Sequence, residues 1–122
     1  KTGLPPADLP VNEVARRERT YWLGPQLAES YFVLWRTTRD EKYRERAWAL
    51  AESIYKHART AKGYVCSFDV DQVPTKVFIN YQTPDFLAGT LKYLYLIFGD
   101  NVEEMPLERW VFNLYGQPLP VL

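Results

Sequence analysis

Hydrophobic residues recur at helical spacing over residues 25–37 and again over residues 40–63. In the first stretch Pro25 stands at the first helical position, where a missing N–H is tolerated. The second stretch has Asp40 as a candidate N-cap and Gly63 as its stop signal. Because the connection between the two stretches is short, the pattern predicts an antiparallel αα-hairpin. The apolar stripe of the first helix consists of Leu27, Tyr31, Leu34 and Trp35.

A third helix is predicted over residues 83–99. Thr83 is its candidate N-cap, Pro84 stands at the first helical position, and Gly99 ends the segment. The residues between are apolar nearly all round, which is typical of a buried helix rather than of one with a solvent face.

The remaining patterns predict short strands. The β-rich runs at residues 64–68 and 76–80 indicate two strands or a loose hairpin, and residues 107–112 indicate a buried strand. In the connecting turn, Asp69 and Asp71 are better explained as solvated side chains than as a cation site. The stretch "NLYGQPLPV" follows the last strand and holds a glycine and two prolines.

The first part of the chain has a different composition. Residues 1–11 contain three prolines and a glycine, which predicts an extended arm that needs a neighbouring surface to become ordered. A short helix starting at Asn12 is expected within residues 12–22. We therefore divide the chain into residues 1–21, an arm with a possible short helix, and residues 22–122, a helical domain.

Composition narrows the function classes. A chain of 122 residues with 47% hydrophobic content builds one core, and fifteen basic against fifteen acidic residues give no field that would recruit nucleic acid. The apolar run at 93–98 is far shorter than the roughly 18 residues of a membrane span. Cys66 and His57 are each the sole residue of their type, so a disulfide, a zinc site or a Ser/His/Asp triad is not expected. We expect Cys66 to be buried and His57 to interact with the end of a helix.

Several stretches within about residues 22–121 resemble the C-terminal part of glycoside hydrolase family 47, the class I α-1,2-mannosidases, in the same order and with similar spacing. The matching stretches include "LAESYFVLWRTTRDEKYRERAWALAESIYKHART", "FLAGTLKYLYLIFGD" and "PLERWVFNLYGQPLPV". The resemblance implies a mainly α fold, with αα-hairpins from an (α/α) barrel and a small β-hairpin that plugs the barrel. It also implies a calcium ion in the active site and hydrolysis with inversion by two carboxyl groups. A chain of this length would form an incomplete barrel.

The resemblance assigns site positions, and most of them have changed. The family motif R-P-E-T-x-E-S reads "GPQLAES" here, so Gly24 replaces a sugar-binding arginine and Gln26 replaces the candidate catalytic base. Only Glu29 of the acidic pair is retained. An amide cannot accept the proton of an attacking water.

Two further motifs have lost their acidic residues. M-E-S-F-F-L-A-E-T reads "QTPDFLAGT", so Thr83 and Gly89 replace glutamates and Asp85 replaces a phenylalanine that packs on the sugar. N-T-E-A-H-P-L-P reads "NLYGQPLP", so Leu114 replaces the threonine that binds calcium and Tyr115 replaces a glutamate. We therefore expect no metal or other cofactor, because the oxygen ligands that calcium prefers are missing.

We interpret the chain as a pseudoenzyme that acts in interaction or assembly, as a homo-oligomer or a subunit of a larger complex. A small repacked monomer is the simpler alternative. A third interpretation, an active calcium-dependent mannosidase completed by another chain, conflicts with Gln26 and Leu114. The resemblance alone implies the secretory pathway or the extracellular space. A glycan-binding module is the remaining alternative, with candidate contacts Tyr21, Trp22, Gln26, Glu29, Tyr81, Asp85, Tyr115 and Gln117.

Overall fold

The computed structural model describes residues 2–5, 19–67, 69–73, 78–99 and 104–122. Its helices are α1 (Gln26–Thr38), α2 (Lys42–His57), the π-helical segment η2 (Phe86–Leu91) and α3 (Lys92–Phe98), which continues η2. The short helix expected from Asn12 falls largely outside the described residues. Within them, no helix is long and apolar enough to cross a bilayer. The strands are β1 (Arg59–Thr60), β2 (Gly63–Tyr64), β3 (Cys66–Ser67), β4 (Phe78–Ile79), β5 (Trp110–Phe112) and β6 (Pro118–Pro120).

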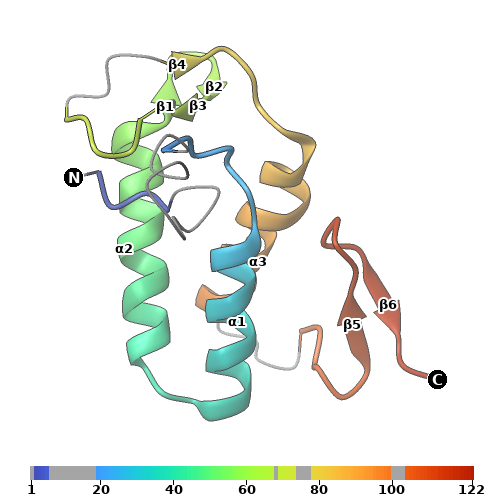
Figure 1. Ribbon diagram of the computed structural model, residues 1–122. Helices are drawn as coiled ribbons and strands as arrows, with labels where there is room; N and C mark the ends of the chain where they lie inside the picture. The colour runs from blue at the N-terminus through green and yellow to red at the C-terminus, as the bar shows by residue number, and fades with distance from the viewer. Residues whose placement is uncertain (1, 6–18, 68, 74–77, 100–103) are drawn as a thin grey trace, which may run out of the picture.

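The predicted αα-hairpin is present: α1 and α2 lie antiparallel, and α3 packs against both (Figure 1). However, α2 ends at His57 rather than near Gly63, because residues 59–64 fold back as the β1–β2 pair. Burial and the charge of Lys56 lower the pKa of His57, so the neutral imidazole is favoured. His57 is the last residue of α2, so it lies at a helix end as expected.

The buried face of α1 is shifted from the predicted stripe. The buried residues are Ala28, Phe32, Trp35 and Arg36, whereas Leu34 is exposed. Leu27 and Tyr31 are only partly buried. The shift follows from packing, because α1 contacts α2 on one side and the η2–α3 segment on the other.

The third helix differs from its prediction in two ways. The Thr83 hydroxyl does not cap it but donates a hydrogen bond to the Trp22 carbonyl at 3.1 Å, and residues 86–91 form a π-helix before α3 begins. The expectation of burial all round is also wrong, since Leu87, Leu91 and Tyr95 are exposed. A π-helix is a rare, wider turn, and neither capping nor periodicity signals it in sequence.

Three aromatic rings connect α1, α3 and the C-terminal hairpin. The Phe32 ring centroid lies 5.6 Å from that of Tyr93 and 5.9 Å from that of Phe112, and Tyr93 and Phe112 are 5.4 Å apart. On the same side, the buried Arg36 guanidinium donates to the carbonyls of Leu96 at 3.3 Å and Glu104 at 3.0 Å. These contacts hold the segment after α3 against α1.

The C-terminal hairpin pairs Trp110 with Pro120 and Phe112 with Pro118. Hydrogen bonds from Asn113 N–H to the Gln117 carbonyl and from Val121 N–H to the Arg109 carbonyl mark the bonded positions of the ladder. Bonded positions alternate along an antiparallel pair, so both prolines fall where an N–H would point away from β5. The prolines therefore leave the ladder intact. The strand expected to be buried has only one packed face, since Val111 is exposed.

The N-terminal residues belong to the same core as the helices. Thr2 donates from its N–H and from its hydroxyl to the Val70 carbonyl, at 3.1 and 2.6 Å. Leu4 and Tyr21 are buried with the helix residues. Residues 2–5 of the predicted arm are therefore ordered by their own chain rather than by a neighbouring molecule.

The β3–β4 region matches two smaller expectations. Cys66 in β3 is fully buried, as predicted, and pairs with Ile79 of β4. Asp69 and Asp71 lie near the Arg19 guanidinium, with N–O distances of 3.9 and 3.7 Å. These half-exposed ion pairs are weak, so the turn is a solvated one with a basic neighbour.

Replacing Thr90 with valine tests the contact between η2 and the segment before α1. Thr90 is fully buried and donates to the Leu23 carbonyl at 2.7 Å. Thr90→Val keeps the shape but leaves that carbonyl buried without its donor, which should cost about 1–3 kcal/mol. Urea unfolding measures the loss. Thr37→Val, on the exposed side of α1, is the matched control and should change stability by under about 0.5 kcal/mol.

Candidate functional site

The positions that the resemblance assigns to a catalytic centre come together where three segments meet. These segments are the start of α1, the π-helical segment η2 and the tip of the C-terminal hairpin (Figure 1). A Cβ atom on Gly89 of η2 would lie 2.7 Å from the Pro25 Cβ at the start of α1. A Cβ atom on Gly116 of the hairpin would lie 2.6 Å from the Ala88 carbonyl oxygen. The three segments are therefore in direct contact at these glycines.

At the start of α1, Gln26 is exposed and Glu29 is half-buried. The Gln26 side-chain oxygen lies over Gly24, in the space that a side chain at that position would take. The Ser30 hydroxyl donates to the Gln26 carbonyl at 2.7 Å, within the helix. This turn thus presents one amide and one carboxylate.

The Glu29 carboxylate lies near Tyr93 of α3. Burial, followed by the Glu29 charge, raises the pKa of the Tyr93 hydroxyl well above its usual range. The hydroxyl is buried and makes no hydrogen bond of good geometry with the described residues, although Glu29 is close enough to act on its pKa. Tyr93 therefore stays protonated at neutral pH and acts as a neutral neighbour of Glu29.

The η2 segment contributes little polar chemistry. The Thr83 hydroxyl is engaged with the Trp22 carbonyl, and Asp85 is half-buried at the helix start. Gly89 is buried and offers no side chain, and Pro25 occupies the space where one would begin. The Pro25 ring therefore fills the space beside Gly89 where a side chain at that position would begin.

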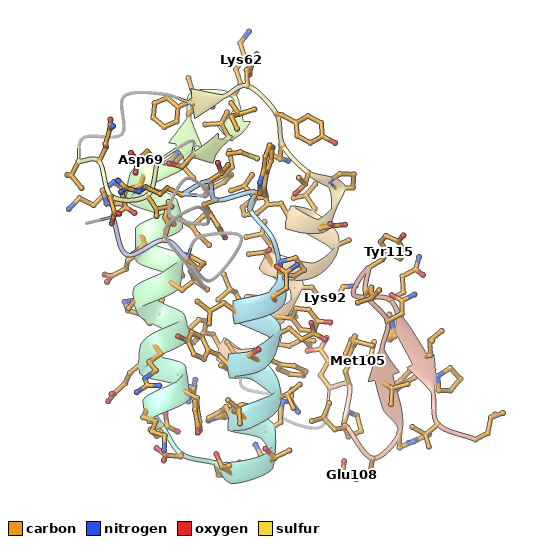
Figure 2. All side chains as sticks on the ribbon, in the orientation of Figure 1. Lys62, Asp69, Lys92, Met105, Glu108 and Tyr115 are labelled. Carbon is orange, nitrogen blue, oxygen red and sulfur yellow. The ribbon has the colours of Figure 1, made fainter. Side chains whose placement is uncertain are left out.

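The hairpin tip is well ordered and points two large side chains to solvent. Leu114 is 91% exposed and Tyr115 is 64% exposed. The Asn113 carboxamide oxygen accepts the N–H groups of Tyr115 and Gln117, both at 3.0 Å. The Lys92 ammonium of α3 donates to the Gly116 carbonyl, so it connects the helices to the tip (Figure 2).

The candidate glycan contacts do not all reach the surface. Tyr21 is 3% exposed, and the backbone of Tyr21 pairs with Ser67, so the prediction that it stacks on a sugar ring is wrong. Trp22 and Tyr81 are exposed on the segments that precede α1 and η2. Tyr115 and Gln117 are exposed at the hairpin tip.

A groove between α2 and α3 was not located from the sequence. Its volume is about 1180 Å³, and residues of α2 and of the η2–α3 segment form most of its lining. Its lining is mostly apolar, with Glu52 and Lys56 among the polar residues. The sequence does indicate such a groove, because aromatic residues of α2 and α3 recur at helical spacing outside the buried stripe of each helix. The large apolar residues of the lining are Trp48, Ile54, Tyr55, Tyr64, Leu91, Leu94, Tyr95 and Phe98.

In the parts of the chain that the structure describes, no group of three or more His, Cys, Asp or Glu residues lies together as a metal site would require. The sequence analysis also missed three residues that order the hairpin tip: Lys92, Asn113 and Gly116. An Asn three residues before a Gly is a turn signal, but nothing in the sequence places Lys92 beside that turn.

Comparisons with known proteins agree on one family. The model described as "Glycosyl hydrolase family 47" matches residues 8–121. The chain is 46% identical to mannosyl-oligosaccharide 1,2-alpha-mannosidase IA of Sus scrofa over 92% of its length, which is 17% of that relative. It is 38% identical to the endoplasmic reticulum mannosyl-oligosaccharide 1,2-alpha-mannosidase of Mus musculus, over 96% of this chain and 18% of the relative.

A solved structure gives the same result for the fold. The alpha-1,2-mannosidase from Trichoderma reesei is similar with a TM-score of 0.80 and 26% identity, over 86% of this chain and 22% of that one. The chain thus spans about a fifth of the solved relative, and the described residues keep the shape that the corresponding segment has in it.

Substituting Tyr93 tests the buried, unbonded hydroxyl. Because the folded-state pKa exceeds the unfolded value of about 10, stability should be constant below pH 10 and fall as pH rises further. Tyr93→Phe should be neutral or slightly stabilising at pH 7 and should reduce the alkaline loss, since it removes one such group. Urea unfolding at pH 7 and pH 11 measures both effects. Tyr95→Phe, on the exposed side of α3, should leave both values unchanged.

Proposed function

The chain belongs to glycosyl hydrolase family 47, and on that premise we propose that it is a non-catalytic relative of the α-1,2-mannosidases that acts as an interaction or assembly element. The observation that carries the proposal is Gln26, which stands where the resemblance places the catalytic base. A carboxamide has no basic oxygen at neutral pH, and loss of a general base typically lowers the rate by about 10² to 10⁴.

The other site positions support the same proposal. Gly89 has no side chain and its Cβ position is blocked by Pro25, and Leu114 and Tyr115 replace polar groups with an alkyl chain and a phenol. Glu29 is the one retained carboxylate of the family motif, and it lies beside the neutral Tyr93. Inversion needs a carboxylate that acts as base, and Gln26 stands where the resemblance places it.

The residues at the calcium positions do not fit a calcium ion. Calcium prefers six to eight oxygen ligands, several of them carboxylates or backbone carbonyls. Leu114 offers only its backbone carbonyl, and Thr83 and Gly89 stand where the resemblance places glutamates. We therefore include loss of the metal in the proposal and derive no step through it.

The proposed interaction role is supported by the surfaces that the described residues leave open. The groove between α2 and α3 exposes Trp48, Tyr55 and Tyr95, and the outer face of the hairpin exposes Val111 and Leu119. The chain spans 22% of the similar solved mannosidase. In a protein of that length, other segments can pack on the corresponding faces. We propose that the chain is one wedge of an incomplete (α/α) barrel, and that a second copy or another subunit covers these faces.

Glycan binding is a second candidate, and the exposure of Trp22, Tyr81 and Tyr115 favours it, because aromatic rings stack on sugars. We rank it lower because Gly24 and Asp85 replace the arginine and phenylalanine that the resemblance assigns to sugar contacts. An active mannosidase completed by another chain is ranked lowest because of Gln26. For location, we propose the secretory pathway, since one relative is named for the endoplasmic reticulum.

A mannosidase assay tests the catalytic part of the proposal. The protein, incubated with an α-1,2-linked high-mannose oligosaccharide and calcium, should release no mannose above a no-protein blank. Release that disappears in Glu29→Gln would contradict the proposal, because it would assign catalysis to the retained carboxylate. An active family member run in parallel shows that the assay works.

Calcium should not stabilise the fold. A ligand at a hundred times its dissociation constant adds about 2.7 kcal/mol of stability, which is readily seen in a melting curve. We expect the same melting temperature in millimolar calcium and in EDTA. A clear rise with calcium, absent with magnesium, would show that a specific calcium site remains.

The native mass tests the assembly role. Sedimentation at micromolar concentration should give more than the 14.3 kDa of one chain. Trp48→Glu, together with Tyr95→Glu, should restore the single-chain mass, because both place a charge in the apolar groove. Phe78→Glu, at an exposed position outside the groove, is the matched control and should not. A cooperative monomer in the unaltered protein would favour the small monomeric alternative.

A further inference from the structure

The hairpin tip contacts η2 at Gly89, the position where the resemblance places a glutamate of the catalytic site. We propose that Gly89, Gly116 and Lys92 form a clasp that fixes the C-terminal hairpin on the helices, and that this clasp prevents an acidic side chain from returning at position 89. The inference rests on the proposed loss of the catalytic centre. Its test measures folding rather than activity, so the two can fail separately.

Gly116 is the part of the clasp with the least freedom. Its φ of +68° lies in the left-handed region, where a side chain is strained. A Cβ atom there would lie 2.6 Å from the Ala88 carbonyl oxygen and 3.1 Å from the Gly89 Cα. Both contacts are with backbone atoms, which no rotamer change can move. A side chain at residue 116 would therefore require the tip to move away from the η2 backbone.

Gly89 meets a rigid neighbour on its other side. A Cβ atom at this position would lie 2.7 Å from the Pro25 Cβ and 3.0 Å from the Pro25 Cγ. The proline ring cannot swing away as an unbranched chain would. A glutamate at position 89 would have to move the start of α1 or lift the hairpin.

Lys92 adds a polar bond to this packing. It is the first residue of α3, directly after the π-helical segment that contains Gly89. Its ammonium donates to the Gly116 carbonyl, and the lysine is half-buried between α3 and the hairpin (Figure 2). A hydrogen bond from a charged donor is stronger than a neutral one.

Gly24 differs from the two clasp glycines. A Cβ atom there would contact only the end of the Gln26 side chain, which is flexible and lies at the surface. The arginine that the resemblance places at this position can return if Gln26 turns away. The structure thus distinguishes one lost position that is free to revert from one that is locked.

Amide hydrogen exchange on the Gly89→Glu variant tests the clasp. The Asn113 and Val121 N–H groups bond within the hairpin, so they report its release. We expect both amides to exchange at least tenfold faster, which corresponds to about 1.4 kcal/mol of local stability. Leu87→Glu places the same charge on the exposed side of η2, and Gly24→Arg restores the other family residue. Both controls should keep the unaltered exchange rates.

A double-mutant cycle covers the case in which Gly89→Glu does not fold. Gly89→Ala and Gly116→Ala should each lower the melting temperature, and the double variant should lose less than the sum, because either change alone opens the clasp. Lys92→Met should accelerate hairpin exchange without unfolding α1 and α2. Additive losses in the cycle, or Gly89→Glu exchange rates equal to those of Leu87→Glu, would overturn the inference.

Discussion

The packing of Phe32, Tyr93 and Phe112 is the interaction on which the rest of the structure depends. These rings come from α1, α3 and β5, three segments far apart in the sequence, and their centroids lie within 6 Å of one another. A two-stranded hairpin has little stability in water by itself. The Phe112 ring gives the hairpin a place in the core, and the tip can then rest on η2. Without that anchor, the contact between Gly116 and Ala88 would have no support.

The second constraint is the close approach of backbones at the positions that the resemblance assigns to the catalytic centre. A site for a sugar and a metal needs open space lined with oxygen ligands, whereas here Gly89 and Gly116 allow the segments to touch. The π-helical turn that contains Gly89 is also of a kind often found at functional sites of proteins. In this chain the π-helical turn is in contact with Pro25 and with the hairpin tip.

The apolar groove between α2 and α3 follows from the way the helices pack. α1 packs against α2, α3 and η2, so Phe32 and Trp35 are buried, whereas α2 and α3 each leave aromatic residues uncovered by the described residues. Their remaining aromatic residues line the groove. Burying apolar area is worth roughly 25 cal/mol per Å², so a groove of this kind favours association with other helices. This explains why a chain related to one segment of a larger enzyme keeps apolar residues on two faces.

The sequence by itself determined the αα-hairpin and the family, because periodicity and motif identity are local properties of the chain. It also indicated correctly that Cys66 is buried. Only the tertiary structure decided that Tyr21 is inaccessible, that the buried face of α1 includes Phe32 rather than Leu34, and that α2 ends at His57. Each of these depends on which elements pack together, and local spacing carries no record of distant neighbours. For the same reason, the clasp between Lys92 and Gly116 joins residues 24 positions apart, and only the folded chain brings them together.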